Sequence, residues 1–220
     1  MIEIKNLNKI YLKGKKNMVH ALNNINLKID DRETVAIIGE SGAGKSTLLH
    51  IMSCIDNFDG EYYLDNIDIN KLSESKKSKL RSSKIGIVLQ DFALIDDFTV
   101  FENVMTPLYF NKKIKDKKGS VMRALKKTGI ASLKAKKVSQ LSGGQKQRVA
   151  ISRALVTSPE YIFADEPTGS LDSKTSEEIV KMLFDLNRNG ITIIIVTHNL
   201  DIANKCQRVI EIKEIGRAHV

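Results

Sequence analysis

One stretch of this sequence decides the fold: Thr34-Val-Ala-Ile-Ile-Gly39-Glu-Ser-Gly-Ala-Gly-Lys45-Ser46-Thr-Leu-Leu-His-Ile-Met52. Its first five residues are apolar or β-branched and predict a buried strand. Residues 39–46 match the pattern G-x-x-x-x-G-K-[ST] without a mismatch, and residues 47–52 predict a helix. A strand, a glycine-rich loop and a helix in this order are typical of α/β proteins that bind phosphate at a helix N-terminus.

Each residue type in this loop has a task in phosphate binding. The three glycines let the backbone curl, so that its N–H groups point at phosphate oxygens. Lys45 supplies a mobile positive charge for the β- and γ-phosphates, and Ser46 offers a hydroxyl to Mg²⁺. A glycine-rich turn with a chance lysine is the alternative, and the flanking strand and helix count against it. The predicted ATP-binding residues of the loop are Gly39, Ser41, Gly42, Gly44, Lys45, Ser46 and Thr47.

A second candidate phosphate site lies about a hundred residues further on, at Leu141-Ser-Gly-Gly-Gln145. The adjacent glycines Gly143 and Gly144 follow a serine and expose backbone N–H groups at a predicted helix start. One chain therefore carries two motifs suited to the same anion.

Composition and length are those of a globular protein. The chain has 220 residues, of which 42% are hydrophobic and 28% charged. The longest apolar run, Ile191–Val196, is far too short to cross a bilayer, and residues 1–5 lack the pattern of a signal peptide. Cys54 and Cys206 lie in apolar surroundings and are interpreted as reduced, buried thiols. These features predict a cytoplasmic location and a membrane role that depends on a partner.

The formal net charge is +9, and many lysines occur in clusters. Such a basic surface could contact nucleic acid or an anionic membrane. Solvated loops are the favoured interpretation, because no aromatic residues are interleaved for base stacking, and no nucleic-acid partner is expected. The clusters are Lys13, Lys15 and Lys16; Lys112, Lys113, Lys115, Lys117 and Lys118; and Lys134, Lys136 and Lys137.

The predicted strands fall into two kinds. Residues 2–5 and 25–29 alternate apolar with polar side chains, as half-exposed strands do, and residues 62–69 predict two short strands around Asp65-Asn66. Residues 85–90, 161–165 and 191–197 are buried strands. Helices are predicted over 71–83 and 175–186, so strands alternate with helices and a mostly parallel sheet is expected.

The character of the sequence changes between Phe101 and Lys137. This part is lysine-rich, predicts helices broken at Pro107 and Gly129, and is interpreted as an inserted helical lobe. We predict one domain, residues 1–220, with a catalytic core over 1–90 and 160–213. The helical subdomain with the 141–145 motif covers about 91–159, and residues 214–220 form an atypical tail expected to be disordered or non-essential.

Together with these motifs, the strand 161–165 and Glu166 make the chain resemble the ATP-binding subunit of an ABC transporter over nearly its whole length. The resemblance implies an α/β fold of the P-loop NTPase (RecA-like) type, with an N-terminal antiparallel β subdomain and an inserted α-helical subdomain. Further motifs follow in the family's order. They are Tyr11 for adenine stacking with Val19 near the ribose, Gln90 of the Q-loop, Asp165-Glu166 of Walker B, Ser170-Leu171-Asp172 of the D-loop, and Thr197-His198 of the switch.

The catalytic residues expected on this basis are Glu166, His198 and Gln90. Asp165 ends a buried strand, where α/β sheets bind ligands, and can hold Mg²⁺ with Ser46 and Gln90. Glu166 can polarise the attacking water as a general base. The resemblance implies that His198 contacts the γ-phosphate and holds Glu166 and water in line. A helix N-cap is the alternative role for the paired carboxylates.

The resemblance also explains the second phosphate motif. In this family two subunits pair head to tail, with ATP between the P-loop of one and the signature motif of the other. A chain with one copy of each motif must pair, and a homodimer creates two equal sites. The residues expected to contact ATP in trans are Ser142, Gly143, Gly144, Gln145 and Asp172.

Residues 92–108 are similar to a branch that contains lipoprotein-releasing, macrolide-export, antimicrobial-peptide-resistance and cell-division ATPases. An integral membrane permease is the implied partner, at the cytoplasmic face of the cell membrane, with export or mechanical transmission as the output. The groove for this partner is expected to include Phe92, Phe98, Phe101 and Val104; ordinary packing within the lobe is the alternative.

Two other functions stay open at this point. A soluble ABC ATPase acting on DNA or ribosomes is disfavoured, because only 51 positions separate Gln90 from Leu141, too few for a long coiled coil, and one cassette is present instead of two. A regulator of cell division would use the same ATP cycle and is barely separated from an exporter.

Overall fold

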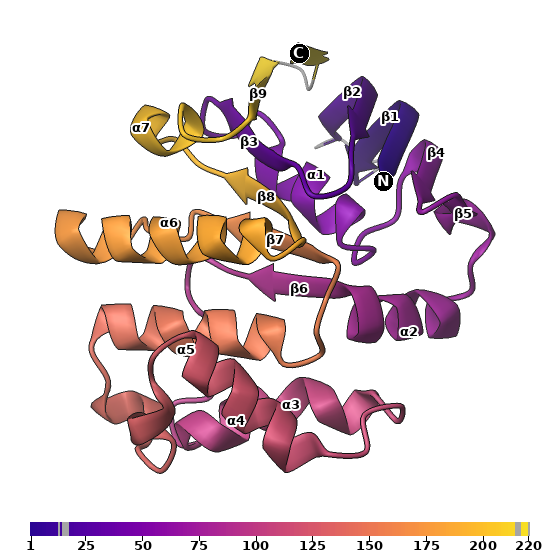
Figure 1. Cartoon of the computed structure of the whole chain (residues 1–220). Helices are drawn as coiled ribbons and strands as arrows, with labels where there is room; N and C mark the ends of the chain where they lie inside the picture. The colour runs from indigo at the N-terminus through magenta and orange to yellow at the C-terminus, as the bar shows by residue number, and fades with distance from the viewer. Residues whose placement is uncertain (13, 15–17, 214–216, 220) are drawn as a thin grey trace.

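The structure is a computed structural model that describes residues 1–12, 14, 18–213 and 217–219. A small antiparallel sheet, a larger parallel sheet and a lobe of helices follow one another down the molecule (Figure 1). One expected lysine cluster, Lys13, Lys15 and Lys16, lies outside the described residues, as do residues 17, 214–216 and 220.

The antiparallel sheet has the strand order β2-β1-β4-β5. Its strands are β1 (Ile2–Tyr11), β2 (Val19–Ile29), β4 (Asp59–Leu64) and β5 (Ile67–Asp68). Asp65 and Asn66 join the last two strands and both have positive φ, 50° and 62°, as a type I′ hairpin turn requires. The two expected strands around this turn are confirmed, and β1 and β2 are longer than their alternating segments indicate.

The larger sheet has the order β10-β9-β3-β8-β7-β6, and all its pairs except β10 with β9 are parallel. Its strands are β3 (Thr34–Gly39), β6 (Ile85–Val88), β7 (Tyr161–Asp165), β8 (Thr192–Val196), β9 (Arg208–Lys213) and β10 (Arg217–His219). The predicted mostly parallel sheet is thus confirmed. Because parallel strands end at one edge, the chain segments that follow β3, β6, β7 and β8 meet there.

Helices cover both faces of this sheet. The core helices are α1 (Lys45–Met52), α2 (Glu74–Lys84), α6 (Ser173–Arg188), the short α7 (Leu200–Ala203) and the 3₁₀ turn η1 (Ile69–Lys71). In α6 the apolar side chains Ile179, Leu183 and Leu186 recur at helical spacing and are buried. They place this helix against the sheet and leave its polar face exposed.

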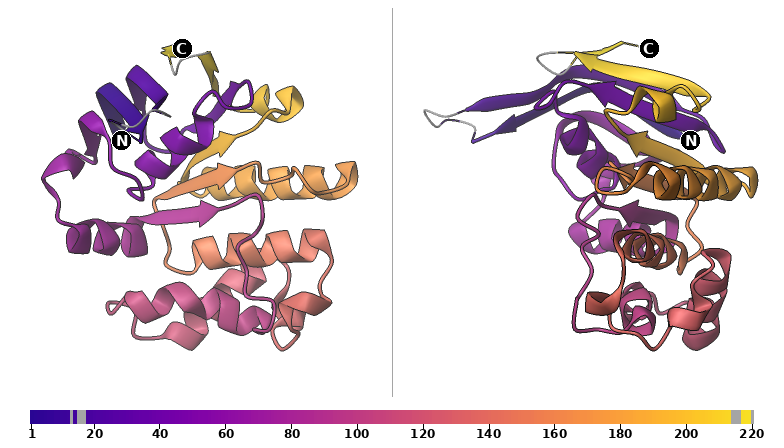
Figure 2. Two further views of the ribbon diagram at one scale, coloured as in Figure 1. Left: turned by 180° about the vertical axis from the view of Figure 1, so that it is seen from behind. Right: turned by 90° about the vertical axis from the view of Figure 1, so that its left-hand side faces the viewer.

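The helical lobe is inserted between β6 and β7 and lies at one end of the molecule in every view (Figure 2). It contains α3 (Val100–Phe110), α4 (Lys117–Lys127), α5 (Gly143–Leu155), η2 (Ala131–Leu133) and η3 (Val138–Gln140). The expected helix break at Pro107 is wrong, because α3 continues through it for three residues. Gly129, at φ 73°, does follow the end of α4. We propose residues 91–159 as the bounds of this lobe.

Two hydrophobic clusters form the core, one on each face of the parallel sheet. In β8, Ile194 packs into the cluster with α1 and the antiparallel sheet, whereas Ile193 and Ile195 face the cluster of α6 and the lobe. This strand is therefore buried on both faces, as its unbroken apolar run predicts. Val104 is 0% exposed within the second cluster, so its expected place in a partner groove is wrong.

Within the tail, Arg217–His219 form β10 and pair antiparallel with β9. Strand pairing uses backbone groups, so the free edge of β9 can accept these residues whatever their side chains. The expectation that residues 214–220 are disordered or non-essential stays a prediction. Elsewhere in the described part of the chain, no helix combines the length and apolar character needed to span a bilayer.

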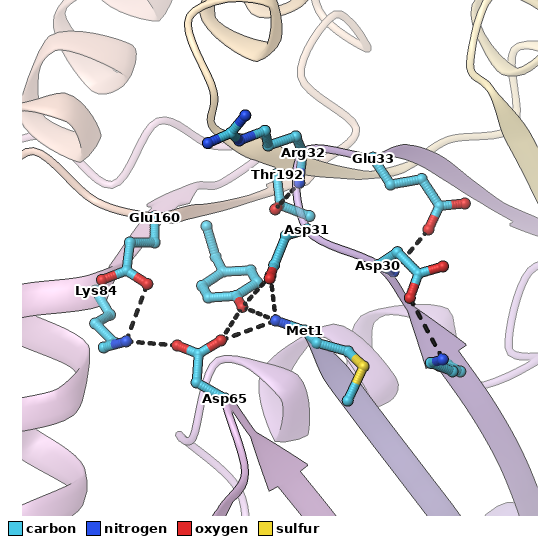
Figure 3. Close-up of polar contacts among 11 residues, drawn as sticks. Met1, Asp30, Asp31, Arg32, Glu33, Asp65, Lys84, Glu160 and Thr192 are labelled. Atoms are coloured by element: carbon cyan, nitrogen blue, oxygen red, sulfur yellow. Dashed lines mark hydrogen bonds and ion pairs between the residues drawn. The ribbon is translucent and has the colours of Figure 1, made fainter.

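A polar cluster ties the two sheets together (Figure 3). Asp65 lies in the turn between β4 and β5. Its Oδ1 is 2.5 Å from the Tyr161 hydroxyl at the start of β7, and its Oδ2 is 2.5 Å from Lys84 Nζ at the end of α2. The Met1 amino group is 2.8 Å from Asp65 and also contacts Asp31 and Tyr161. The cluster joins segments that are far apart in the sequence.

Candidate nucleotide-binding and hydrolysis site

Two glycines of the 39–46 loop, Gly39 and Gly44, are required by space as well as by conformation. Gly39 has φ 149°, and a Cβ there would lie 2.2 Å from the Ile212 carbonyl oxygen. Gly44 has φ 94°, and its Cβ would lie 2.3 Å from the Ala21 carbonyl oxygen. No side chain larger than hydrogen fits at either position, so the loop can pack against β2 and β9 only with these glycines.

The start of α1 is prepared for an anion. Gly44 is its N-cap, and the first turn has neither a side-chain cap nor an acidic residue. The backbone N–H groups there and the helix dipole therefore favour a bound phosphate. Lys45 Nζ donates to the carbonyl oxygens of Gly39 at 2.9 Å and Glu40 at 2.7 Å, which holds its positive charge over the loop.

This loop borders a cavity of about 400 Å³, which brings most of the sequence-predicted residues together. Gly39, His198 and the signature residues do not line it. The lining residues are Tyr11, Val19, Ala21, Ser41, Gly42, Gly44, Lys45, Ser46, Thr47, Gln90, Asp165, Glu166 and Val196. They come from the antiparallel sheet, the P-loop and the ends of β6, β7 and β8.

Asp165 ends β7, beside the Ser46 side chain. Burial raises the pKa of Asp165 above its usual value, and the neighbouring Glu166 carboxylate raises it further, whereas the Ser46 side chain acts to lower it. A carboxylate that is costly to ionise here favours a bound cation, which would stabilise its charge. The hydroxyl of Ser46, the carboxylate of Asp165 and the amide of Gln90 all border one cavity, and such oxygen donors suit Mg²⁺.

Glu166 is held by the segment that follows β8. Its Oε1 accepts from the His198 backbone N–H at 2.9 Å and lies 2.8 Å from His198 Nδ1. Its Oε2 accepts from the Thr197 hydroxyl at 3.2 Å. The expected pair Glu166 and His198 is therefore in direct contact. The Glu166 side chain is only 12% exposed and the His198 side chain 73%.

Glu166 also has a left-handed backbone, with φ 44°. This conformation is unfavourable for a residue with a side chain, and it recurs at functional sites that the surrounding structure holds in place. Here the Glu166 N–H donates to the Val196 carbonyl at 2.9 Å, which ties the end of β7 to β8. The strain aims the carboxylate at the switch segment and the cavity.

Tyr11 is fixed at the opposite side of the cavity by partners that no motif revealed. Its hydroxyl donates to Asp56 Oδ2 at 2.8 Å and is 3.4 Å from Thr47 Oγ1. Lys9 Nζ lies 4.8 Å from the centre of the Tyr11 ring and 3.8 Å from Asp56. These contacts orient the ring, so Asp56 and Lys9 belong to the site although neither stands in a recognisable pattern.

His50 is a further residue that sequence reasoning left without a role. It lies one helical turn beyond Ser46, a spacing that places both on one side of α1. Its side chain acts electrostatically to lower the pKa of Asp165, against the effect of burial. The spacing of four from Ser46 was the signal that could have placed it near the carboxylate.

The signature residues are organised as a helix start. The Ser142 side chain accepts from the Gln145 N–H at 3.4 Å, and the Ser142 N–H donates to the Gln145 side chain at 3.1 Å, which makes a capping box for α5. A Cβ on Gly144 would lie 2.5 Å from Thr175 Cγ2. Gly144 thus allows close approach to the start of α6.

Asp172 is the N-cap of α6 and accepts from the N–H of Thr175 at 2.9 Å and from its hydroxyl at 2.6 Å. In this chain its carboxylate therefore has a capping role. Neither Asp172 nor residues 142–145 line the P-loop cavity. The structure of one chain leaves the two phosphate-binding motifs apart.

The fold and the site define a P-loop nucleotide-binding protein with a carboxylate held at its phosphate end. A family model described as ABC transporter matches residues 22–169. The chain belongs to the ABC transporter family. With the relatives described next, this confirms the predicted fold, the ABC-type ATPase and ATP as its nucleotide.

Similar proteins can be aligned with almost the whole of this chain. The uncharacterized ABC transporter ATP-binding protein YvrO of Bacillus subtilis is 44% identical over 97% of this chain and 94% of its own length. MJ0796 of Methanocaldococcus jannaschii is 45% identical over the same shares. The macrolide export ATP-binding/permease protein MacB of Mannheimia succiniciproducens is 44% identical, and there the match covers 33% of the longer relative.

Solved structures agree with this assignment. The dimeric structure of the MJ0796 cassette has a TM-score of 0.91 and 42% identity, covering 100% of this chain and 97% of that one. A dimeric post-hydrolysis state of the same cassette holds ADP and Pi, with a TM-score of 0.91.

Proposed function

We propose that this ABC ATPase is the ATP-hydrolysing subunit of a membrane transporter, in which two copies enclose two ATP molecules head to tail. One observation carries the proposal. Lys45 and Glu166 line the same cavity. The signature residues at the start of α5, which include Gly143 and Gly144, lie outside that cavity. The dimeric cassette of 42% identity supports the same arrangement.

Within one chain, each residue has a stated task. Tyr11, fixed through Asp56, stacks on the adenine, and Val19 lies near the ribose. The P-loop N–H groups and Lys45 bind the phosphates. Glu166 accepts a proton from the attacking water, and His198 holds the Glu166 carboxylate through the 2.8 Å contact and reaches toward the γ-phosphate.

Ser46, Asp165 and Gln90 would hold Mg²⁺, since their oxygen donors border one cavity. The ion supplies charge neutralisation for the phosphate oxygens. Gln90 follows β6, and its amide lies close to Gly169, where an added Cβ would be 3.5 Å from Gln90 Nε2. This amide therefore bridges the cavity and the D-loop, a position from which it can report nucleotide state.

The second half of each ATP site comes from the partner copy. Ser142, Gly143, Gly144 and Gln145 bind the γ-phosphate of the ATP on the other chain, with Asp172 beside them. ATP thus stabilises the closed pair and hydrolysis releases it, because the nucleotide has different affinity for the two states. This closing and opening of the pair delivers motion to the membrane partner.

The partner that receives this motion is an integral membrane permease, and the ATPase meets it at the cytoplasmic face of the membrane. A groove of about 240 Å³ separates the core from the lobe and is lined by residues of α2, β6, α3 and α5. It is mainly apolar and includes Ile55, Leu89 and Pro107. Leu89 directly precedes Gln90, so a segment seated in this groove would sense the nucleotide site. The similarity to MacB favours export or mechanical transmission by the partner.

The test is Glu166→Gln. We expect this variant to bind ATP, to lose hydrolysis, and to elute as a dimer in gel filtration with ATP and Mg²⁺, because the amide cannot accept the proton of water. Lys45→Ala in the same background is the control and should stay monomeric, since it lacks the phosphate-binding ammonium. A Glu166→Gln chain that stays monomeric while binding ATP would overturn the head-to-tail proposal.

A further inference from the structure

The positive charge of this protein is concentrated in one part of the helical lobe. Residues 112–137 hold eleven of the 35 basic side chains and one of the 26 acidic ones. Their net charge of +10 exceeds the +9 of the whole chain, so the rest of the molecule is close to neutral. A charge gathered in this way needs an explanation beyond general solubility.

The loop between α3 and α4, together with the first turn of α4, carries the least compensated part of this charge. Lys112, Lys113, Lys115 and Lys118 are all exposed, and none forms an ion pair with any carboxylate that the structure describes. Arg123 does pair with Asp116 at 3.2 Å, the one acidic residue in the segment. Four free ammonium groups thus lie within seven residues of chain.

Two aromatic side chains stand beside these lysines. Tyr109 and Phe110 are 65% and 74% exposed, the largest values of any big hydrophobic residue in the described chain. The lysine-rich segment therefore has aromatic neighbours at its start, although none is interleaved with the lysines. Lys117 Nζ lies 5.6 Å from the centre of the Tyr109 ring and covers it, which makes that ring a poor platform for base stacking.

The loop is built to present these groups outward. Asn111 is buried, and its side chain donates to the Ser82 carbonyl at 2.8 Å and accepts from the Lys113 N–H at 3.0 Å. Its neighbours Phe110 and Lys112 are both exposed. One buried anchor thus fixes a loop that projects at the lower right of Figure 1.

The loop also lies on the side where the permease is proposed to dock. Ser82, its anchor, and Pro107, three residues before Phe110, both line the groove between core and lobe. A permease segment in that groove would bring the loop toward the bilayer from which the segment emerges.

We propose that this surface, defined as Tyr109, Phe110, Lys112, Lys113, Lys115 and Lys118, binds the anionic phospholipid headgroups of the membrane around the permease. Lysines gain electrostatic energy near such headgroups, and aromatic side chains favour the interface between headgroups and acyl chains. The contact orients the ATPase beside its partner. This inference rests on the proposed function for its biological setting, though not for its measurement.

The experiment sediments the purified full-length chain with sucrose-loaded vesicles of phosphatidylglycerol and phosphatidylcholine, at about 100 mM salt, without nucleotide. We expect binding to these vesicles, weak binding to pure phosphatidylcholine, and loss of binding at high salt. Lys112→Gln/Lys113→Gln should weaken the partition coefficient about 25-fold, since each lysine contributes about fivefold. Phe110→Ser should weaken it with little change in the salt dependence.

Lys134→Gln/Lys136→Gln is the matched control, with the same loss of charge. The backbone carbonyls of Lys134 and Lys136 accept from Phe101 and Val100 at the other end of α3, about 15 Å away and beyond the screening length. The control should change binding less than about twofold. Equal losses in the two pairs, or equal binding to both lipid mixtures, would overturn the proposal.

A tighter complex with a uridine oligonucleotide that depends on Lys112 and Lys113 would also overturn it, in favour of nucleic acid. None of the substituted residues lines the nucleotide cavity, so ATPase activity should be unchanged. Failure of the Glu166→Gln dimer with intact vesicle binding would reject the proposed function alone. The reverse outcome would reject the membrane contact alone.

Discussion

Glu166 shows how neighbouring groups can position a single side chain for the catalytic role proposed for it. Three bonds from Thr197 and His198 fix its two oxygens, and a left-handed backbone aims it. Two of these bonds do not need the imidazole, because the His198 backbone N–H and the Thr197 hydroxyl supply them. The ring is therefore available for the contact with the γ-phosphate that we propose.

This division of work predicts the effect of His198→Ala. We expect kcat to fall about 100-fold, the range for a positioned acid–base partner, while the Kd for ATP changes less than about twofold. His198 does not line the cavity that receives the nucleotide, which is why binding should be spared. Steady-state ATPase assays and titration with a fluorescent ATP analogue measure both quantities. An equal loss in Kd and kcat would contradict the assigned role.

A second residue-scale prediction concerns Asp65 and pH. Partial burial opposes ionisation, but hydrogen bonds from Lys84, the Met1 amino group and Tyr161 outweigh it and hold the pKa of Asp65 well below its usual value. A lowered folded-state pKa stabilises the protein fully above the unfolded value near 4, and this stabilisation is lost as pH falls further. Asp65→Asn should therefore be less stable at pH 7, with a smaller difference near pH 3.

Urea unfolding of both proteins at the two pH values measures this difference. Asp30→Asn is the control, because its ion pair with Lys28 is exposed, with side chains 71% and 58% accessible. Such surface pairs contribute little, so its stability should follow the parent at both pH values. A constant difference for Asp65→Asn across the pH range would reject the electrostatic explanation.

At the scale of elements, Arg153 links the signature helix to the loop after Gln90. From α5 it donates to the Phe92 carbonyl at 2.8 Å and also contacts the Ala93 carbonyl. Phe92 and Ala93 have φ of 60° and 45°, so the guanidinium clamps two adjacent strained residues. Burial lowers the pKa of Arg153, and no carboxylate bonds to it in the described chain. Arg153 is thus a positioning residue for Gln90.

Arg153→Ala should lower kcat about tenfold with little change in the Kd for ATP, since a displaced Gln90 affects orientation more than binding. Arg153→Lys should recover part of the loss, because one ammonium can reach one of the two carbonyls. Arg81→Ala is the control in the same groove, where Arg81 donates to the Cys54 carbonyl at 2.5 Å and does not contact this loop. Equal effects of the two alanine variants would indicate general loosening of the groove.

The elements that could be predicted from sequence are those with a local signal. The run 34–38, the P-loop and the alternation in residues 25–29 each specify a structure without help from distant residues. The helix break predicted at Pro107 was wrong because a proline near the end of a helix costs one hydrogen bond, and the packing of α3 in the lobe compensates for that loss. The prediction that Val104 lines a partner groove was wrong because a sequence pattern does not distinguish residues of a groove from those of the core beneath it.

Contacts between distant segments left no such signal. Asp56 reaches Tyr11 across 45 positions, and Arg153 reaches Phe92 across 61. Neither pairing follows from residue type or spacing, since both depend on how sheets and helices stack. The motif residues could be predicted because nucleotide chemistry restricts their identity, whereas their supporting residues are restricted only by geometry.

At the scale of the whole molecule, two separate cores meet at the parallel sheet. The P-loop and α1 belong to the cluster with the antiparallel sheet, and α5 with its signature residues belongs to the cluster with the lobe. Each phosphate-binding motif is thus carried by a different packed unit. Small rotations between the units can move the motifs relative to each other without disrupting either core, as nucleotide-dependent closure requires.

The trans site predicts the behaviour of two chains with different lesions. In a Glu166→Gln background, Lys45→Ala removes the P-loop ammonium, and Ser142→Arg blocks the signature side at the cost of one helix cap, about 1 kcal/mol. Homodimers of either chain contain no complete site. A mixed dimer contains one site in which both halves are intact, so mixed dimers isolated through two different tags should hold one radiolabelled ATP per pair.

The control mixes a chain carrying both lesions with the Glu166→Gln parent. There every site in a mixed dimer has one damaged half, and no ATP-bound mixed dimer should be recovered. If P-loop and signature motif served the same chain, the two outcomes would be exchanged.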